Sequence, residues 1–185
     1  MNNTRIERDF CFQTGLYFED KFHIGVYDIT MSMLVETDSI KEQNIAMERI
    51  IYFLHEVIQN SVLVSSSKQD VIRQYQSIDL RVCELPEEPY DQILAMVLLL
   101  KLNSIAENRL KITDLVIGSS LSDGVRFNIV SEVAESAFSG KYWWNSSCVA
   151  MNSRDYEICD QSKVIKLFTD DWNNLGLSWR DMAKN

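Results

Sequence analysis

The chain has 185 residues, 46% of them hydrophobic, and its 27 acidic against 18 basic residues give a formal charge of −9 and a pI near 4.7. This length is typical of one globular domain, and the negative surface argues against nucleic acid or an anionic membrane as a partner. The first residues carry no signal sequence and the four cysteines show no metal-ligand spacing, so we expect reduced thiols in the cytoplasm, or in a host's cytoplasm if the protein is viral.

Two runs near the N-terminus predict a β-hairpin. Residues 10–18 are rich in aromatics, and residues 26–35 alternate apolar with polar side chains, the pattern of a half-buried strand. A capping box at Ser39 and Glu42 then predicts the start of a long helix that ends near Asn60. The apolar residues of this helix recur three and four positions apart, so one stripe is expected to face the core.

The middle of the chain predicts a short extended piece at 62–64, a short helix at 67–77 and a second extended piece at 80–83. Pro89 suits the first position of the next helix, where its missing N–H is tolerated. Residues 93–100 of that helix are all apolar, which predicts burial on most sides. The run is shorter than the ~20 residues that cross a bilayer, so it is expected to be core.

A second hairpin is predicted from residues 110–117 and 125–129, which flank a loop containing two glycines. The expected fold class is therefore α+β, a four-stranded antiparallel sheet in ββααββ order with two main helices on one face. The open edges of such a sheet must be covered or paired. We therefore expect a homo-oligomer that assembles edge to edge.

The composition changes after residue 130. Residues 163–168 predict a strand and residues 170–179 a broken helix. We therefore divide the chain into an α+β domain at 1–130 and a C-terminal extension at 131–185. The extension is expected to pack on the domain or on a neighbouring subunit.

Three segments occur in an order that matters for function. Residues 22–29 (FHIGVYDI) resemble a His-Gly-His-Asn-Tyr motif at the start of a second strand, residues 45–62 resemble the helix that follows it, and residues 85–93 (LPEEPYDQI) resemble a Pro-Thr-x-Glu-Asn helix start. These are features of the tunnelling-fold (T-fold) superfamily of pyruvoyl- and carboxy-tetrahydropterin synthases. The resemblance implies subunits joined into a barrel, with pterin- or purine-like ligands held between them by a glutamate.

The zinc chemistry of those synthases has no counterpart here. They bind zinc through three histidines, whereas this sequence contains only His23 and His55. Their cysteine–aspartate–histidine proton relay is also missing from the matching positions. The resemblance thus implies no metal and no cofactor, and it favours a role without catalysis. In its few Gly and Pro and many Met, Asn and Ser, the chain also resembles uncharacterised proteins of tailed phages.

The expected ligand-binding residues are Glu87, Glu88, His23 and Tyr90. A carboxylate at a helix start can accept two hydrogen bonds from the amidine face of guanine or pterin. Both glutamates equally fit as exposed complements to the helix dipole. His23 needs an acidic partner to act as an acid or base, and otherwise it is an ordinary hydrogen-bonding residue.

Tyr142, Trp143 and Trp144 are the expected partner-binding residues, because such aromatics dominate protein interfaces. The alternative is that they fold back to cap the sheet. Three functions follow from these features. The first is a non-catalytic oligomer that binds a purine- or pterin-like ligand or a nucleotide between subunits. The second is a viral or mobile-element protein that binds another protein. The third is a metal-independent pterin or purine enzyme using Glu88 and His23.

Overall fold

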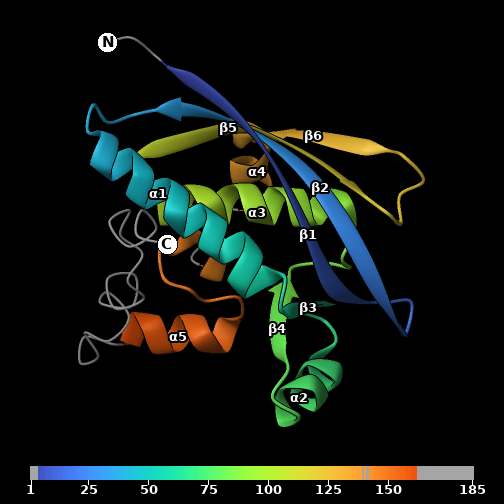
Figure 1. Cartoon of the computed structure of the whole chain (residues 1–185). Helices are drawn as coiled ribbons and strands as arrows, with labels where there is room; N and C mark the ends of the chain where they lie inside the picture. The colour runs from blue at the N-terminus through green and yellow to red at the C-terminus, as the bar shows by residue number, and fades with distance from the viewer. Residues whose placement is uncertain (1–3, 139, 141, 162–185) are drawn as a thin grey trace, which may run out of the picture.

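Figure 1 shows the computed structural model, which describes residues 4–138, 140 and 142–161. The fold is α+β, with a six-stranded mixed sheet in the order β4-β3-β1-β2-β5-β6 and the long helices packed on one face. The strand and helix expected at 163–168 and 170–179 lie outside the described residues. In the part of the chain that is described, no helix has the length and apolar character needed to span a membrane.

The two predicted hairpins form the larger part of the sheet. β1 pairs antiparallel with β2, β2 with β5, and β5 with β6, so the hairpins lie side by side. This arrangement agrees with the alternation of apolar and polar residues along their strands. The strands are β1 (Arg5–Phe18), β2 (Lys21–Val35), β3 (Ser61–Ser65), β4 (Arg81–Leu85), β5 (Leu110–Ser119) and β6 (Arg126–Val130).

The predicted four-stranded antiparallel sheet is wrong, because β3 and β4 extend the sheet parallel to β1. It also departs from the four-stranded sheet that the T-fold resemblance implies. Helix α2 (Gln69–Ser77) connects the two added strands, as a parallel pair requires. Leu63 and Cys83 face the main core, while Val62 and Val82 belong to a second apolar cluster that includes α2. Apolar and polar residues do not alternate in strands that are buried on both faces. The sequence of β3 and β4 therefore does not indicate that they belong to the sheet.

The main helices share one face of the sheet (Figure 1). Ser39 caps α1 by accepting a hydrogen bond from the backbone N–H of Glu42, as the capping box predicts. Helix α3 lies between α1 and β5 and is buried on most sides, as its apolar run predicts. The remaining elements are α1 (Ile40–Tyr52), its π-helical continuation η1 (Phe53–Ile58), α3 (Asp91–Ala106), α4 (Ser131–Ala137), the 3-10 turn η2 (Trp143–Asn145) and α5 (Ser153–Gln161).

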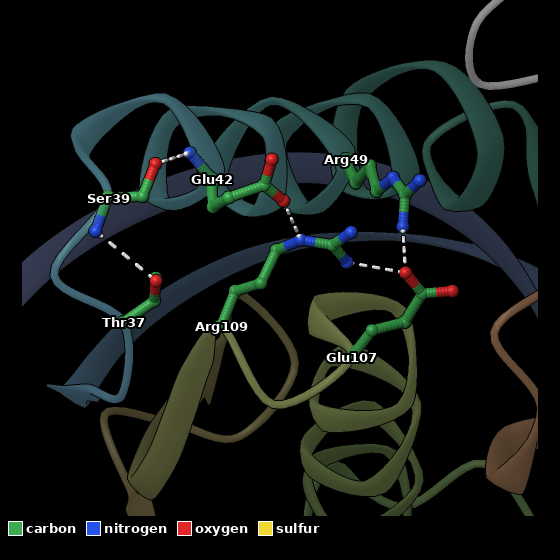
Figure 2. Close-up of polar contacts among 6 residues, drawn as sticks. All are labelled: Thr37, Ser39, Glu42, Arg49, Glu107 and Arg109. Atoms are coloured by element: carbon green, nitrogen blue, oxygen red, sulfur yellow. Dashed lines mark hydrogen bonds and ion pairs between the residues drawn. The ribbon is translucent and has the colours of Figure 1, made fainter.

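Four charged side chains tie α1 to the junction between α3 and β5 (Figure 2). Arg109 Nε lies 2.6 Å from Glu42 Oε2, and Arg49 Nη1 lies 2.6 Å from Glu107 Oε2. Arg109 also pairs with Glu107, which ends α3 in a left-handed conformation with φ 51°. Burial raises the pKa of Glu107, but hydrogen bonds from the two arginines outweigh it and lower the pKa below its ordinary value.

Described residues between 131 and 157, among them Ala134, Trp143 and Met151, pack into the same core as the sheet, and Lys101 of α3 binds this segment. This lysine is fully buried, and its Nζ donates hydrogen bonds to the backbone carbonyls of Trp143, Ser146 and Cys148 at 2.9, 2.8 and 2.6 Å. On the other side of η2, Trp143 Nε1 donates to the carbonyl of Glu84 at 2.8 Å. The described part of the extension is therefore fixed to both α3 and β4.

Candidate functional site

A pocket of about 340 Å³ opens where the tip of the first hairpin meets the start of α3 and the loop between β5 and β6. Its volume is at the lower end of the range typical for small-molecule sites. The pocket is more apolar than polar in its exposed lining. The lining residues are Leu16 and Phe18 of β1, Pro89, Tyr90, Asp91 and Gln92 around the start of α3, Ser119 at the end of β5, Leu121 and Ser122 in the loop that follows, and Phe127 of β6.

Aromatic side chains give the pocket its walls. Phe18 and Tyr90 meet edge to face with their ring centroids 5.2 Å apart. Tyr90 is 51% exposed, so one side of its ring remains open to the solvent. Phe127 contributes a third ring from β6. Rings in this arrangement provide surfaces on which a planar ligand can stack.

Two of the buried polar atoms that have no hydrogen-bond partner among the described residues bear on this pocket. They are Oδ2 of Asp91, which lines the pocket, and the hydroxyl of Tyr27, whose residue is completely buried. Burial, and next the charge of Asp91, raise the pKa of Tyr27 above its ordinary value. The Tyr27 ring fits only because residue 25 is glycine, since a Cβ there would lie 2.8 Å from the ring.

The helix start adds hydrogen-bond donors beside this carboxylate. Tyr90 occupies the N-cap position of α3 in an extended conformation, and its side chain makes no capping bond. The first backbone N–H groups of a helix have no partner within the helix. An acceptor at Asp91 therefore lies next to backbone donors. This combination suits a ligand edge that presents both N–H groups and a carbonyl.

The structure brings two of the expected ligand-binding residues to this region. Tyr90 lines the pocket directly. His23 stands opposite Leu16 in the hairpin, on the same face of the sheet, so it lies next to the pocket wall without lining it. Glu87 is exposed and Glu88 is half-buried, with one carboxylate oxygen enclosed and unpartnered, and neither residue lines the pocket.

The expected partner-binding residues lie elsewhere, on the helical side of the core. Trp143 and Trp144 are buried against α3, and only Tyr142 is exposed, at 47%. They fold back, but onto α3 rather than onto the open face of the sheet.

Sequence reasoning missed Asp91, Phe18 and Phe127 as site residues. In the sequence, Asp91 looks like an acidic residue that complements the helix dipole. Its place in a pocket depends on strands that are distant in the sequence. Phe18 and Phe127 belong to different hairpins, and their sequence positions do not indicate that they face one pocket. Among the described residues no group of three or more His, Cys, Asp or Glu could hold a metal ion.

Comparison with known proteins does not add a family to this description. A scan against protein-family models found no match for the sequence, and a search of curated proteins found no significant match. The geometry of the pocket is therefore the basis for any statement about function.

Proposed function

We propose that this protein binds a small planar nitrogen heterocycle of the purine or pterin type, free or as a nucleotide, and does not transform it. The ligand lies in the pocket at the start of α3, stacked against Tyr90 and Phe18. Its donor-rich edge faces Asp91. The proposal replaces Glu87 and Glu88 as anchors with Asp91, which lines the cavity.

The observation that carries the proposal is the buried Oδ2 of Asp91, which has no hydrogen-bond partner among the described residues. A buried acceptor without a donor lowers stability by about 1–3 kcal/mol, and more when it is charged. A ligand that donates two N–H bonds to this carboxylate removes that cost and adds charge-assisted bonds. The 2-amino and N1–H groups of guanine and pterin supply such a pair of donors. Apolar ligands without donors leave the carboxylate unsatisfied.

A thermal-shift series tests the proposal. Guanosine and pterin at 1 mM are expected to raise the melting temperature by about 5–10 °C, since a ligand at 100 times its Kd stabilises a protein by about 2.7 kcal/mol. Inosine, which lacks the 2-amino group, is expected to give a clearly smaller rise. No shift with any purine or pterin would contradict the proposal. Recovery of a chemically altered ligand would contradict its non-catalytic part.

We also propose that copies of the chain associate through the edge of β1. Strand β3 pairs with β1 only at Gly15 and Leu16, so the stretch from Arg5 to Gln13 has no strand partner on that side among the described residues. The odd-numbered residues of the stretch, like Gly15, point their backbone groups toward the β3 side. Such an open edge is a template for pairing with another chain.

Glu7→Pro is expected to convert the oligomer to a monomer. Proline removes one outward N–H of β1, and the hydrogen bonds to β2 come from the even-numbered residues and stay intact. Native mass spectrometry and sedimentation give the mass. Glu7→Ala, which keeps the N–H, is the matched control and is expected to leave the mass of the oligomer unchanged. A monomeric parent chain would contradict the proposal at once.

A further inference from the structure

A second cavity, of about 290 Å³, has a lining that shares no residue with the pocket at the start of α3. It is formed where β4 ends, between α4, η2 and the first residue of α5. The lining combines aromatic rings with one carboxylate. The lining residues are Ser66, Glu84, Leu85, Pro86, Ala137, Phe138, Tyr142, Trp143, Trp144 and Ser153.

The aromatic part of the lining is a cluster of four rings. Tyr142 stacks on Trp144 with centroids 4.7 Å apart, Phe138 meets Trp144 at 5.8 Å and Trp143 meets it at 5.6 Å. Trp144 is buried by its neighbours, and its Nε1–H has no acceptor among the described residues. Tyr142 is the exposed member, so it stands at the solvent side of the cluster.

The carboxylate of Glu84 provides the charge. The residue is only 8% exposed, and its two oxygens accept hydrogen bonds from Gln69 Nε2 at 3.2 Å and from the backbone N–H of Ser153 at 2.9 Å. Both donors are neutral, and no ion pair among the described residues involves Glu84. A buried carboxylate without a cation is costly, and a positive ligand group offsets that cost.

We propose that this second cavity binds an organic cation, an ammonium group carried either by a small molecule or by a lysine side chain of a partner. Aromatic faces attract ammonium groups by about 0.5–2 kcal/mol each, and a buried carboxylate adds a fixed opposite charge. The net charge of −9 draws cations toward the surface as a whole. This site is independent of the heterocycle pocket.

Calorimetric titration of the full chain with two pairs of probes tests the proposal. Choline is compared with its neutral isostere 3,3-dimethyl-1-butanol, and N-acetyl-lysine amide with N-acetyl-norleucine amide. In at least one pair the cation is expected to bind at least tenfold more tightly than its neutral counterpart, a difference of about 1.4 kcal/mol. Preference for choline indicates a small-molecule ligand, and preference for the lysine amide indicates a partner protein. Equal binding within both pairs, or no binding, overturns the proposal.

Variants separate this site from a general surface effect. Glu84→Gln keeps the size and an acceptor oxygen, and it is expected to weaken cation binding at least tenfold. Tyr142→Ala is expected to weaken it about threefold through the loss of one ring, and this exposed position does not endanger folding. Phe22→Ala, which removes an exposed aromatic ring of β2 that lines neither cavity, is the matched control and is expected to leave the affinity for the cation unchanged. Unaltered cation affinity in both Glu84→Gln and Tyr142→Ala overturns the proposal.

Discussion

Lys101→Met is expected to lower the free energy of unfolding by about 3 kcal/mol, because it removes the donor of three backbone carbonyls. Methionine preserves most of the apolar stem, so the loss reports the hydrogen bonds rather than a cavity. The carbonyl of Trp143 is buried and has no access to water in place of the lysine, so it contributes most of the loss. The turn that contains Trp143 and Trp144 would then lose its anchor on α3.

Chemical denaturation followed by tryptophan fluorescence measures this loss, since two of the four tryptophans lie in the affected turn. The melting temperature is expected to fall by about 10 °C in a chain of this size. Lys111→Met, at an exposed lysine of β5, is the matched control and is expected to change stability by less than about 0.5 kcal/mol. A loss below about 1 kcal/mol for Lys101→Met would show that water replaces the lysine at these carbonyls.

Asp91→Asn is expected to weaken heterocycle binding about 100-fold, and the ligand-free protein is expected to keep or gain stability. The affinity falls because the amide supplies one acceptor where the carboxylate supplies a charged pair, a difference of about 2.7 kcal/mol. Stability does not fall because the variant neutralises a carboxylate whose buried Oδ2 has no hydrogen-bond partner among the described residues and whose charge raises the pKa of Tyr27. Opposite effects on binding and stability are typical of residues held for function.

Glu87→Gln and Glu88→Gln are the informative controls for Asp91→Asn, because the sequence alone points to them as anchors. Neither residue lines the pocket, so each is expected to leave the affinity for guanosine and pterin within about twofold of the parent. Titration calorimetry on the three variants gives the comparison. Loss of binding in Glu88→Gln, together with normal binding in Asp91→Asn, would place the ligand outside the pocket described here.

The hairpins and the long helices were predictable because each has one buried face. Apolar and polar residues alternate along residues 26–35, and apolar residues recur three and four positions apart after Ser39. Both patterns indicate which side of the element is buried. Strands β3 and β4 were not predictable as sheet members, because five-residue segments buried on both sides carry neither period. The predicted boundary at residue 130 rests on composition alone. Composition does not predict that Trp143 donates a hydrogen bond across this boundary to the backbone carbonyl of Glu84.

The candidate site was predictable only where neighbours in sequence are neighbours in space. Tyr90 follows a proline at a helix start, and that local setting was enough to single it out. The electrostatic setting of Asp91 includes Tyr27, which is 64 positions earlier in the chain and whose pKa the charge of Asp91 raises. Local patterns contain no information on such a long-range interaction. This is also why the acidic residues two and three positions upstream of Tyr90 looked equally suitable.

The short parallel contact between β3 and β1 gives the edge of the sheet the shape of a step. A strand laid along Arg5 to Gln13 runs into the end of β3 at Gly15 and cannot slide further. An added strand therefore cannot pair in registers that are shifted toward the tip of the hairpin, whereas a straight edge allows many pairing registers. In the edge-to-edge association proposed above, the step would therefore act as an end stop that limits the registers open to a second copy.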